Sequence, residues 1–147
     1  MTDIATHNDI KMACTELSIA YARHVDFGEY DRFVELFTED AVLDAGFRLE
    51  GKEKIRRSME RRSPELRSRH ILTNIFVDVI SETEATGISY LTLYRHIGPE
   101  SLTDGTVDFQ AASGVGHYTD SFRLTDDGWR IASRSLALAF RNPAHFT

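Results

Sequence analysis

The chain has 147 residues, of which 41% are hydrophobic and 27% charged, so it is long enough to bury a core and has the composition of a globular protein. Its net charge of −6 disfavours nucleic acid as a partner, and no apolar stretch approaches the ~18–20 residues that span a bilayer. The N-terminus lacks the apolar core of a secretory signal and the lone Cys14 excludes an internal disulfide, so we expect a cytoplasmic protein with one domain over residues 1–147.

Two helices are predicted in the first part of the chain. Over residues 7–25, apolar side chains recur at spacings of three and four, which predicts a helix with one buried stripe: Ile10, Cys14, Leu17, Tyr21 and Val25. Gly28 interrupts the pattern. A shorter helix is expected to follow, with an apolar face of Tyr30, Phe33, Val34 and Phe37.

A turn, a short strand and a third helix come next. Residues 38–51 read as a turn and strand closed by Gly51, and residues 52–62 as a helix that ends before Pro64. The basic residues of 52–69 are interleaved with glutamates, which is typical of a solvated helix face. Guidance of an anionic substrate is the alternative interpretation of this basic segment.

The second half of the chain has the signature of strands. Segments near 70–80, 84–95, 107–124 and 129–141 are rich in β-branched and aromatic residues. Asp-Gly pairs within 103–105 and 125–129 are hairpin signals, so these segments predict an antiparallel meander. Helices followed by a meander indicate an α+β fold in which the helices cover one face of a curved sheet and leave a pocket between the layers.

The first candidate for chemistry is His70, in the stretch "RSRHILTN" (67–74). It begins an apolar strand, and strand parity predicts that it shares a face with Leu72, Asn74 and Phe76. A structural, hydrogen-bonded imidazole at the edge of the core is one interpretation. The other is a general base, since histidine titrates near neutrality.

Asp26 is the second candidate, because it lies at the end of the first predicted helix. Carboxylates are disfavoured there by the helix dipole. Asp26 is therefore either a turn residue ahead of Gly28 or a carboxylate held inward by a specific partner. If it lies beside His70, it could orient the ring and stabilise the imidazolium.

Tyr21 could line the same cavity as a weak acid or hydrogen-bond donor, although packing of its ring in the core is an alternative role. His96 and His117 fall in strand segments and are further candidates for a proton donor, as is water. His24, Asp26 and His70 lack further ligands at familiar spacing, so no metal site is expected. No motif for ATP, nicotinamide or flavin is present, and no cofactor is expected.

The chain resembles the SnoaL-like family of the nuclear transport factor 2-like superfamily over nearly its whole length. Four stretches carry the resemblance: "YARHVDFGEYDRFVELFTEDAVL", "RHILTNI", "TEATGISYLTLYR" and "YTDSFRLTDDGWRIASRSLAL". The resemblance implies a cone-shaped α+β barrel, in which a curved antiparallel sheet packs against about three N-terminal helices around a hydrophobic pocket. It also implies a homodimer or homotrimer, paired through the exposed face of the sheet.

Within this superfamily, members such as scytalone dehydratase, bile acid 7-alpha-dehydratase and hexachlorocyclohexane dehydrochlorinase use an Asp–His pair for cofactor-free elimination. Asp26 and His70 match that pair, and Tyr21 matches an active-site tyrosine of the bile acid enzyme. The further acidic and arginine residues of that enzyme have no clear counterparts, and the nearby positions read Thr92, Leu93 and Leu138. The resemblance thus implies a dehydratase-like lyase that acts on a small hydrophobic cyclic molecule.

Two other functions stay open. The small β subunit of aromatic-ring-hydroxylating dioxygenases, which is structural and needs a Rieske-type partner, shares similar features at His70–Asn74, at Tyr94-Arg95, and at Gly128–Ile131 with Arg134. A SnoaL-like protein that binds a small molecule without turnover would also keep the pair in a pocket.

Overall fold

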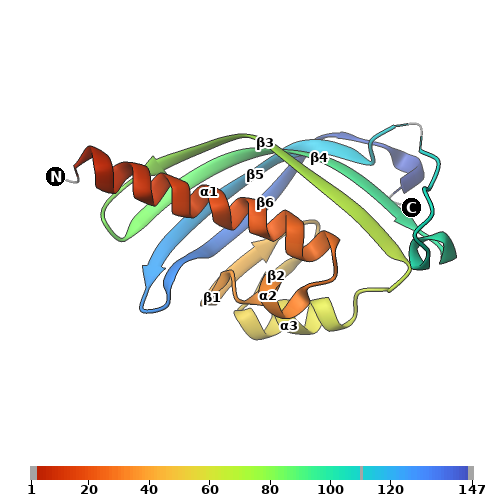
Figure 1. The fold of residues 1–147 in the computed structure, drawn as a ribbon, viewed down its shortest axis with the longest axis horizontal. Coiled ribbons are helices and arrows are strands. Elements are labelled where there is room, and N and C mark those ends of the chain that lie inside the picture. The colour runs from red at the N-terminus through yellow and green to blue at the C-terminus, as the bar shows by residue number, and fades with distance from the viewer. Residues whose placement is uncertain (1–2, 110, 146–147) are drawn as a thin grey trace.

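The computed structural model describes residues 3–109 and 111–145. Helix α1 (Ile4–Asp26) is capped at its N-terminus by Asp3, whose side chain accepts a hydrogen bond from the Thr6 N–H at 2.8 Å. The predicted stripe of α1 is buried, and Figure 1 shows this helix lying across the sheet. The stripe is what holds α1 against the sheet, because its apolar side chains leave water together.

The next elements are α2 (Tyr30–Val34), β1 (Phe37–Asp44), β2 (Arg48–Glu50) and α3 (Lys52–Glu60). The assignment of Phe37 to the second helix is wrong, because Phe37 begins β1. The Ile131 N–H donates a hydrogen bond to the Leu36 carbonyl oxygen at 2.8 Å, so the chain joins the sheet directly after α2. Strand β1 then runs parallel to the last strand, a pairing that sequence periodicity does not reveal.

Four long strands, β3 (Leu66–Val79), β4 (Glu84–Ile97), β5 (Gly114–Thr125) and β6 (Gly128–Arg141), form the predicted antiparallel meander. The complete sheet has six strands in the order β2-β1-β6-β5-β4-β3. The hairpin predicted at 125–129 is confirmed, with Gly128 at a φ of +107° where β6 begins. The α+β class is likewise confirmed.

The hairpin predicted at 103–105 is wrong. Strand β4 continues to Ile97, a 3-10 helix covers Pro99–Leu102, and β5 begins only at Gly114 rather than near 107. Proline cannot donate to a strand ladder, so Pro99 prevents β4 from turning directly into a hairpin. Arg67 instead fastens this connection, since it donates hydrogen bonds to the carbonyl oxygens of Glu100, Thr103 and Gly105 at 3.0, 2.7 and 2.7 Å.

A β-bulge changes the face pattern of β3. The pairing with β4 shifts by one residue between Thr73 and Phe76, and Asn74 within the bulge has a φ of +51°. His70 and Leu72 lie on the inner face as predicted, but the extra residue reverses the alternation beyond them. Phe76 is therefore 65% exposed on the outer face, and the prediction that it shares a face with His70 is wrong.

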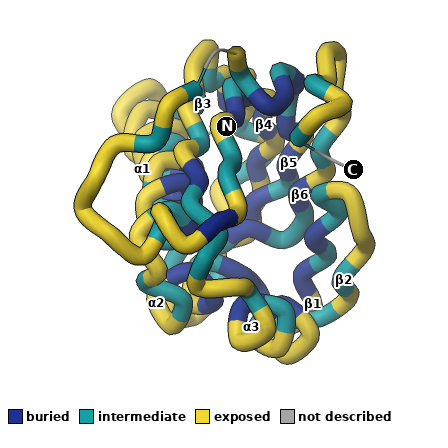
Figure 2. Tube along the Cα trace, turned by 90° about the vertical axis from the view of Figure 1, so that its right-hand side faces the viewer, coloured by how far each residue is buried: buried dark blue, intermediate teal, exposed yellow. Residues whose placement is uncertain are grey.

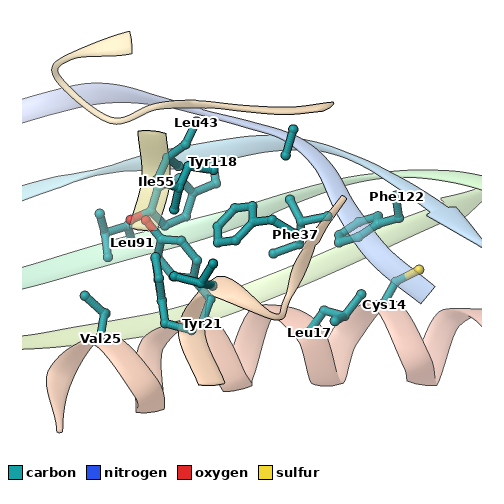
Figure 3. Packing of buried hydrophobic residues seen from close by; sticks show 14 of the residues in the cluster. Cys14, Leu17, Tyr21, Val25, Phe37, Leu43, Ile55, Leu91, Tyr118 and Phe122 are labelled. Carbon is teal, nitrogen blue, oxygen red and sulfur yellow. The ribbon is translucent and has the colours of Figure 1, made fainter. Parts of the chain in front are cut away.

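Helices and sheet surround a common interior. Seen from one end, the buried segments of α1, the long strands, β1 and α3 face inward, and exposed segments lie outside (Figure 2). Figure 3 shows how residues of α1 meet strand residues in this core, with Cys14 and Leu17 near Phe122 and with Tyr21 near Tyr118. Among the described residues, no helix is long and apolar enough to cross a membrane.

We expect Gly116→Ala to destabilise the protein. Gly116 lies at a second bulge, between β5 and β6, and a Cβ at this position would overlap the carbonyl oxygen of Ala137. Backbone must move to accommodate the methyl group, so a loss of about 1–3 kcal/mol in the free energy of unfolding is expected. Urea denaturation measures it, with Gly105→Ala as the control because its Cβ would contact only the Thr103 hydroxyl at 3.3 Å. Equal stability of the two variants would contradict the close approach of β5 and β6.

Candidate active site

The end of α1 positions Asp26. Gly28 has a φ of +71°, and the Glu29 N–H donates to the His24 carbonyl oxygen at 2.8 Å, which ends the helix in a tight turn. Asp26 is the last helical residue, and its side chain is only 6% exposed. Of the two interpretations of this residue, the structure has the inward-facing carboxylate.

Three hydrogen bonds hold the Asp26 carboxylate against β3. The backbone N–H of His70 donates to Oδ2 at 2.7 Å, the ring Nδ1 of His70 lies 2.6 Å from Oδ1, and the Ser68 hydroxyl donates to Oδ1 at 2.8 Å. An ionised carboxylate can only accept, so Nδ1 carries the shared proton and Nε2 keeps its lone pair. Asp26 and His70, forty-four positions apart in the sequence, therefore meet in the geometry of a carboxylate-supported imidazole.

The pKa of Asp26 reflects two opposing effects. Burial favours the neutral acid and raises the pKa, whereas the hydrogen bonds and positive charge supplied by His70, with the hydroxyl of Ser68, lower it. The hydrogen bonds outweigh burial, so the pKa of Asp26 lies below its usual range. The group is thus an anion at neutral pH despite its location in the interior.

Tyr21 lies on the same helix, with its ring packed edge-on against His70 at a centroid distance of 6.2 Å. Its hydroxyl interacts with that of Tyr118, and Figure 3 shows the two oxygens next to each other. Burial raises the pKa of both tyrosines, so both hydroxyls stay protonated at neutral pH. Tyr21 is at once a packed core residue and a hydroxyl that lines the cavity.

Arg134 packs against the rings of both tyrosines. Its guanidinium lies over both rings, 4.4 Å from the ring centre of Tyr21 and 4.3 Å from that of Tyr118. Two hydrogen bonds of 2.8 Å join it to Asp120, and a third of 2.8 Å reaches Ser18 on α1. This buried ion pair fixes the tyrosine rings in place and brings a positive charge close to the Tyr21 hydroxyl.

A cavity of about 510 Å³ opens beside His70. Its walls are mainly apolar and include Val25, Phe33, Leu43, Phe47, Leu49, Met59, Leu66, Leu91, Leu93, Leu136 and Leu138. The polar or charged residues that line it are His70, Tyr21, Tyr118 and three arginines. This volume and lining suit a small, largely hydrophobic molecule.

A second hollow, of about 580 Å³, lies outside α1 and borders Asp26 without touching His70. It is lined largely by polar residues of the segments 62–69 and 101–104. We take the inner cavity as the candidate site, because His70 and Tyr21 line that one. Asp26 then lies behind the imidazole, on the far side from the cavity.

The other histidines lie elsewhere. His96 and His117 alternate with the inner residues of β4 and β5 and therefore lie on the outer face, where His96 contacts Glu100 at 3.0 Å. Neither lines the cavity, whereas Tyr21 does. His24 contacts Glu29 at 3.2 Å rather than Asp26, and no group of three acidic, histidine or cysteine ligands within the described ranges could hold a metal ion.

Several residues of the site were not predicted from the sequence, among them Arg62, Ser68 and Arg95. Arg62 donates a hydrogen bond to Ser68 at 2.8 Å, and Ser68 in turn donates to Asp26. Arg95 pairs with Ser68 across β3 and β4 and lines the cavity. Strand parity could have found Arg95, because the odd positions of β4 from Ala85 onward face inward, whereas Arg62 follows the end of α3 and no periodicity orients it.

With this geometry established, comparisons with known proteins define the family. The sequence profile of the SnoaL-like domain matches residues 9–135, and the chain belongs to this family. A comparison with curated protein sequences gave no match.

Solved structures share the fold. A candidate scytalone dehydratase from Novosphingobium aromaticivorans is 21% identical, with a TM-score of 0.79 over 99% of this chain and 94% of that one. An NTF2-like protein with a cystatin-like fold from the same species is 23% identical, with a TM-score of 0.74 over 99% and 96%. The hexachlorocyclohexane dehydrochlorinase LinA-type3 of Novosphingobium barchaimii is 15% identical, with a TM-score of 0.78 over 99% of both chains. At these identities the likeness establishes the fold and leaves the activity to the site.

The depressed pKa of Asp26 predicts how stability depends on pH. The ionised carboxylate contributes stability above its unfolded-state pKa near 3.8, and this contribution is lost as pH falls through the lower folded-state value. We therefore expect Asp26→Asn to cost about 1.5–3 kcal/mol at pH 7, where hydrogen bonds to a charge are lost. The gap between wild type and variant should narrow below about pH 4.

Urea denaturation at several pH values between 3 and 7 measures this gap. Asp9→Asn is the matched control, since it removes the same charge from an exposed position of the same helix. A gap for Asp26→Asn that stays constant down to pH 3 would contradict an ionised, hydrogen-bonded carboxylate.

Proposed function

We propose that the protein is a cofactor-independent lyase that removes water or a related leaving group from a small hydrophobic cyclic substrate. The observation that carries the proposal is the arrangement of His70: Asp26 holds Nδ1, and the ring lines an apolar cavity. An imidazole held this way offers a basic Nε2 to whatever the cavity contains. The structural neighbours include a candidate dehydratase and a dehydrochlorinase, which agrees with this chemistry, but the proposal is based on the site and not on these neighbours.

In the proposed reaction, Nε2 of His70 removes a proton from a carbon next to a carbonyl group. The electron pair of that C–H bond becomes the new C=C bond, and the leaving group departs from the adjacent carbon with its own electron pair. The products are an unsaturated ring and water, or a halide together with the proton now on His70. No electrons are exchanged with a cofactor in this elimination.

Asp26 is a positioning residue in this mechanism. It fixes the tautomer of His70 that has the lone pair on Nε2, and its negative charge stabilises the imidazolium formed when the proton is taken up. The hydrogen bonds from Ser68 and from the His70 backbone keep this charge in place. Positioned acid–base catalysis of this kind contributes about 10²–10⁴-fold to the rate.

Tyr21 has the role of a proton donor or hydrogen-bond donor to the departing oxygen. Its hydroxyl stays protonated because burial raises its pKa, and of the two nearby charges Arg134 lowers that pKa whereas Asp120 raises it. A leaving hydroxide would take its proton from this hydroxyl or from water, and the proton taken up by His70 then replaces it, so that the enzyme returns to its starting state. Departure of a halide would not need this proton.

A cyclic β-hydroxy ketone tests the proposal. The probe 3-hydroxy-1-tetralone has an acidic C–H next to its carbonyl and a hydroxyl on the next carbon, and it yields 1-naphthol on loss of water. We expect His70→Ala and Asp26→Asn to lower kcat/KM about 10²–10⁴-fold. Tyr21→Phe should have a smaller effect, which we place at about 10-fold because water can replace the hydroxyl. Formation of 1-naphthol is followed by its absorbance.

His117→Ala is the control, because it removes a histidine from the outer face and should leave the rate unchanged. Turnover that persists in both His70→Ala and Asp26→Asn would refute the proposed mechanism. Two other outcomes would favour the alternative functions: co-purification with a large Rieske protein would favour a dioxygenase β subunit, and tight binding of cyclic ketones without turnover would favour a binding protein.

A further inference from the structure

Positive charge is concentrated in the wall of the apolar cavity. Arg62, Arg95 and Arg141 line it, and none of its described lining residues is an aspartate or glutamate. Arg141 is exposed at the end of β6, whereas Arg62 and Arg95 are partly buried close to Ser68. The cavity therefore has an apolar part and one cationic part, and the cationic part adjoins the Asp26–His70 pair.

Arg62 holds an unused donor in this region. Its Nη2 donates to Ser68, but its buried Nε finds no acceptor among the residues that the structure describes. No carboxylate in residues 3–109 or 111–145 forms an ion pair with Arg62. A buried donor without an acceptor costs about 1–3 kcal/mol, so an acceptor brought by a ligand would stabilise this arrangement.

Arg95 brings a second cation to the same place. It lies opposite Ser68 in the β3–β4 ladder, and Ser68 is the residue to which Arg62 donates. Burial and then the charge of Arg62 lower the pKa of Arg95, which indicates that the two guanidinium groups are close enough to repel each other. The charge of Arg62 also reaches the hydroxyl of Tyr21. A guanidinium presents several N–H donors in a planar fork that matches a carboxylate, and both of these arginines line the cavity.

We propose that Arg62 and Arg95 bind a carboxylate of the substrate, so that this site binds a cyclic carboxylic acid more tightly than a neutral ring of the same size. This inference rests on the proposed function only in taking the inner cavity as the substrate site. A carboxylate bound beside Ser68 would leave the ring of the substrate over His70 and in contact with the apolar walls. The carboxylate is an anchor, and the proton removed by His70 comes from a carbon activated by a separate carbonyl group.

Equilibrium binding tests the inference without any need for turnover. The probes are 2-naphthoate and its neutral isostere 2-naphthamide, titrated into the protein by isothermal calorimetry at pH 7.5. We expect wild type to bind the carboxylate at least about tenfold more tightly than the amide, the lower end of what a charge-assisted hydrogen bond supplies. In Arg62→Gln and Arg95→Gln this preference should fall to about threefold or less.

The controls separate charge from folding. Arg57→Gln removes a cation from the exposed face of α3 and should keep the preference. Arg62→Lys and Arg95→Lys retain the positive charge and should keep part of the preference for the carboxylate. Thermal unfolding shows whether each variant is folded. The inference is wrong if wild type binds amide and carboxylate equally, or if Arg57→Gln lowers the preference as much as the cavity variants do.

The two proposals can fail separately. Retention of the carboxylate preference in His70→Ala would show that anion binding does not depend on the base. If that preference is present but the dyad variants still turn over 3-hydroxy-1-tetralone, the anion site stands and the lyase mechanism falls. If turnover depends on the dyad but the preference is absent, the opposite holds.

Discussion

The contact between Asp26 and His70 is the constraint on which the rest of this structure depends. A carboxylate at the C-terminus of a helix is disfavoured by the helix dipole, and burial adds a desolvation cost. Both costs are met by three hydrogen bonds from two residues of β3. Because one of these donors is the backbone N–H of His70, the carboxylate fixes the strand itself and not only a side chain. The same interaction therefore docks α1 on the sheet and sets the tautomer of the imidazole.

A second buried charge pair stabilises the other wall of the site. Arg134 and Asp120 are both almost fully buried, which is costly unless every charged group finds a partner. Two hydrogen bonds to Asp120, one to Ser18 and the faces of two tyrosine rings meet most of this requirement, although Nη1 of Arg134 has no acceptor among the described residues. A well-packed apolar pair could fill this space at lower cost. The guanidinium of this pair lies over the ring of Tyr21, where its charge lowers the pKa of the hydroxyl while the charge of Asp120 raises it.

Sequence patterns predicted the elements better than their pairing. Periodicity identified the buried stripe of α1 and the inward positions of β4, because both follow from local geometry repeated over many residues. It could not predict the parallel pairing of β1 with β6 or the bulge at Asn74, which depend on contacts distant in the sequence. Asp26 and His70 were identified by residue type and family resemblance. Arg62 belongs to the basic segment 52–69, for which the sequence allows a solvated helix face or guidance of an anionic substrate; it lines the cavity because α3 ends at Glu60.

The position of the site follows from where the elements end. Along most of α1 the apolar stripe fills the space above the sheet, so Cys14 and Leu17 are packed against strand residues with no room for a ligand (Figure 3). Helix α1 ends at Asp26, and at the same end of the sheet α3 gives way to β3 and β4 approaches Ile97. Asp26 is the last residue of α1, Arg62 follows the end of α3, and Ser68 and Arg95 are paired near the ends of β3 and β4, so these polar side chains gather at this end of the sheet. The cavity is thus apolar where the middle parts of the strands line it, and polar near the ends of the helices and strands. A substrate with a hydrophobic ring and one charged group would match both parts.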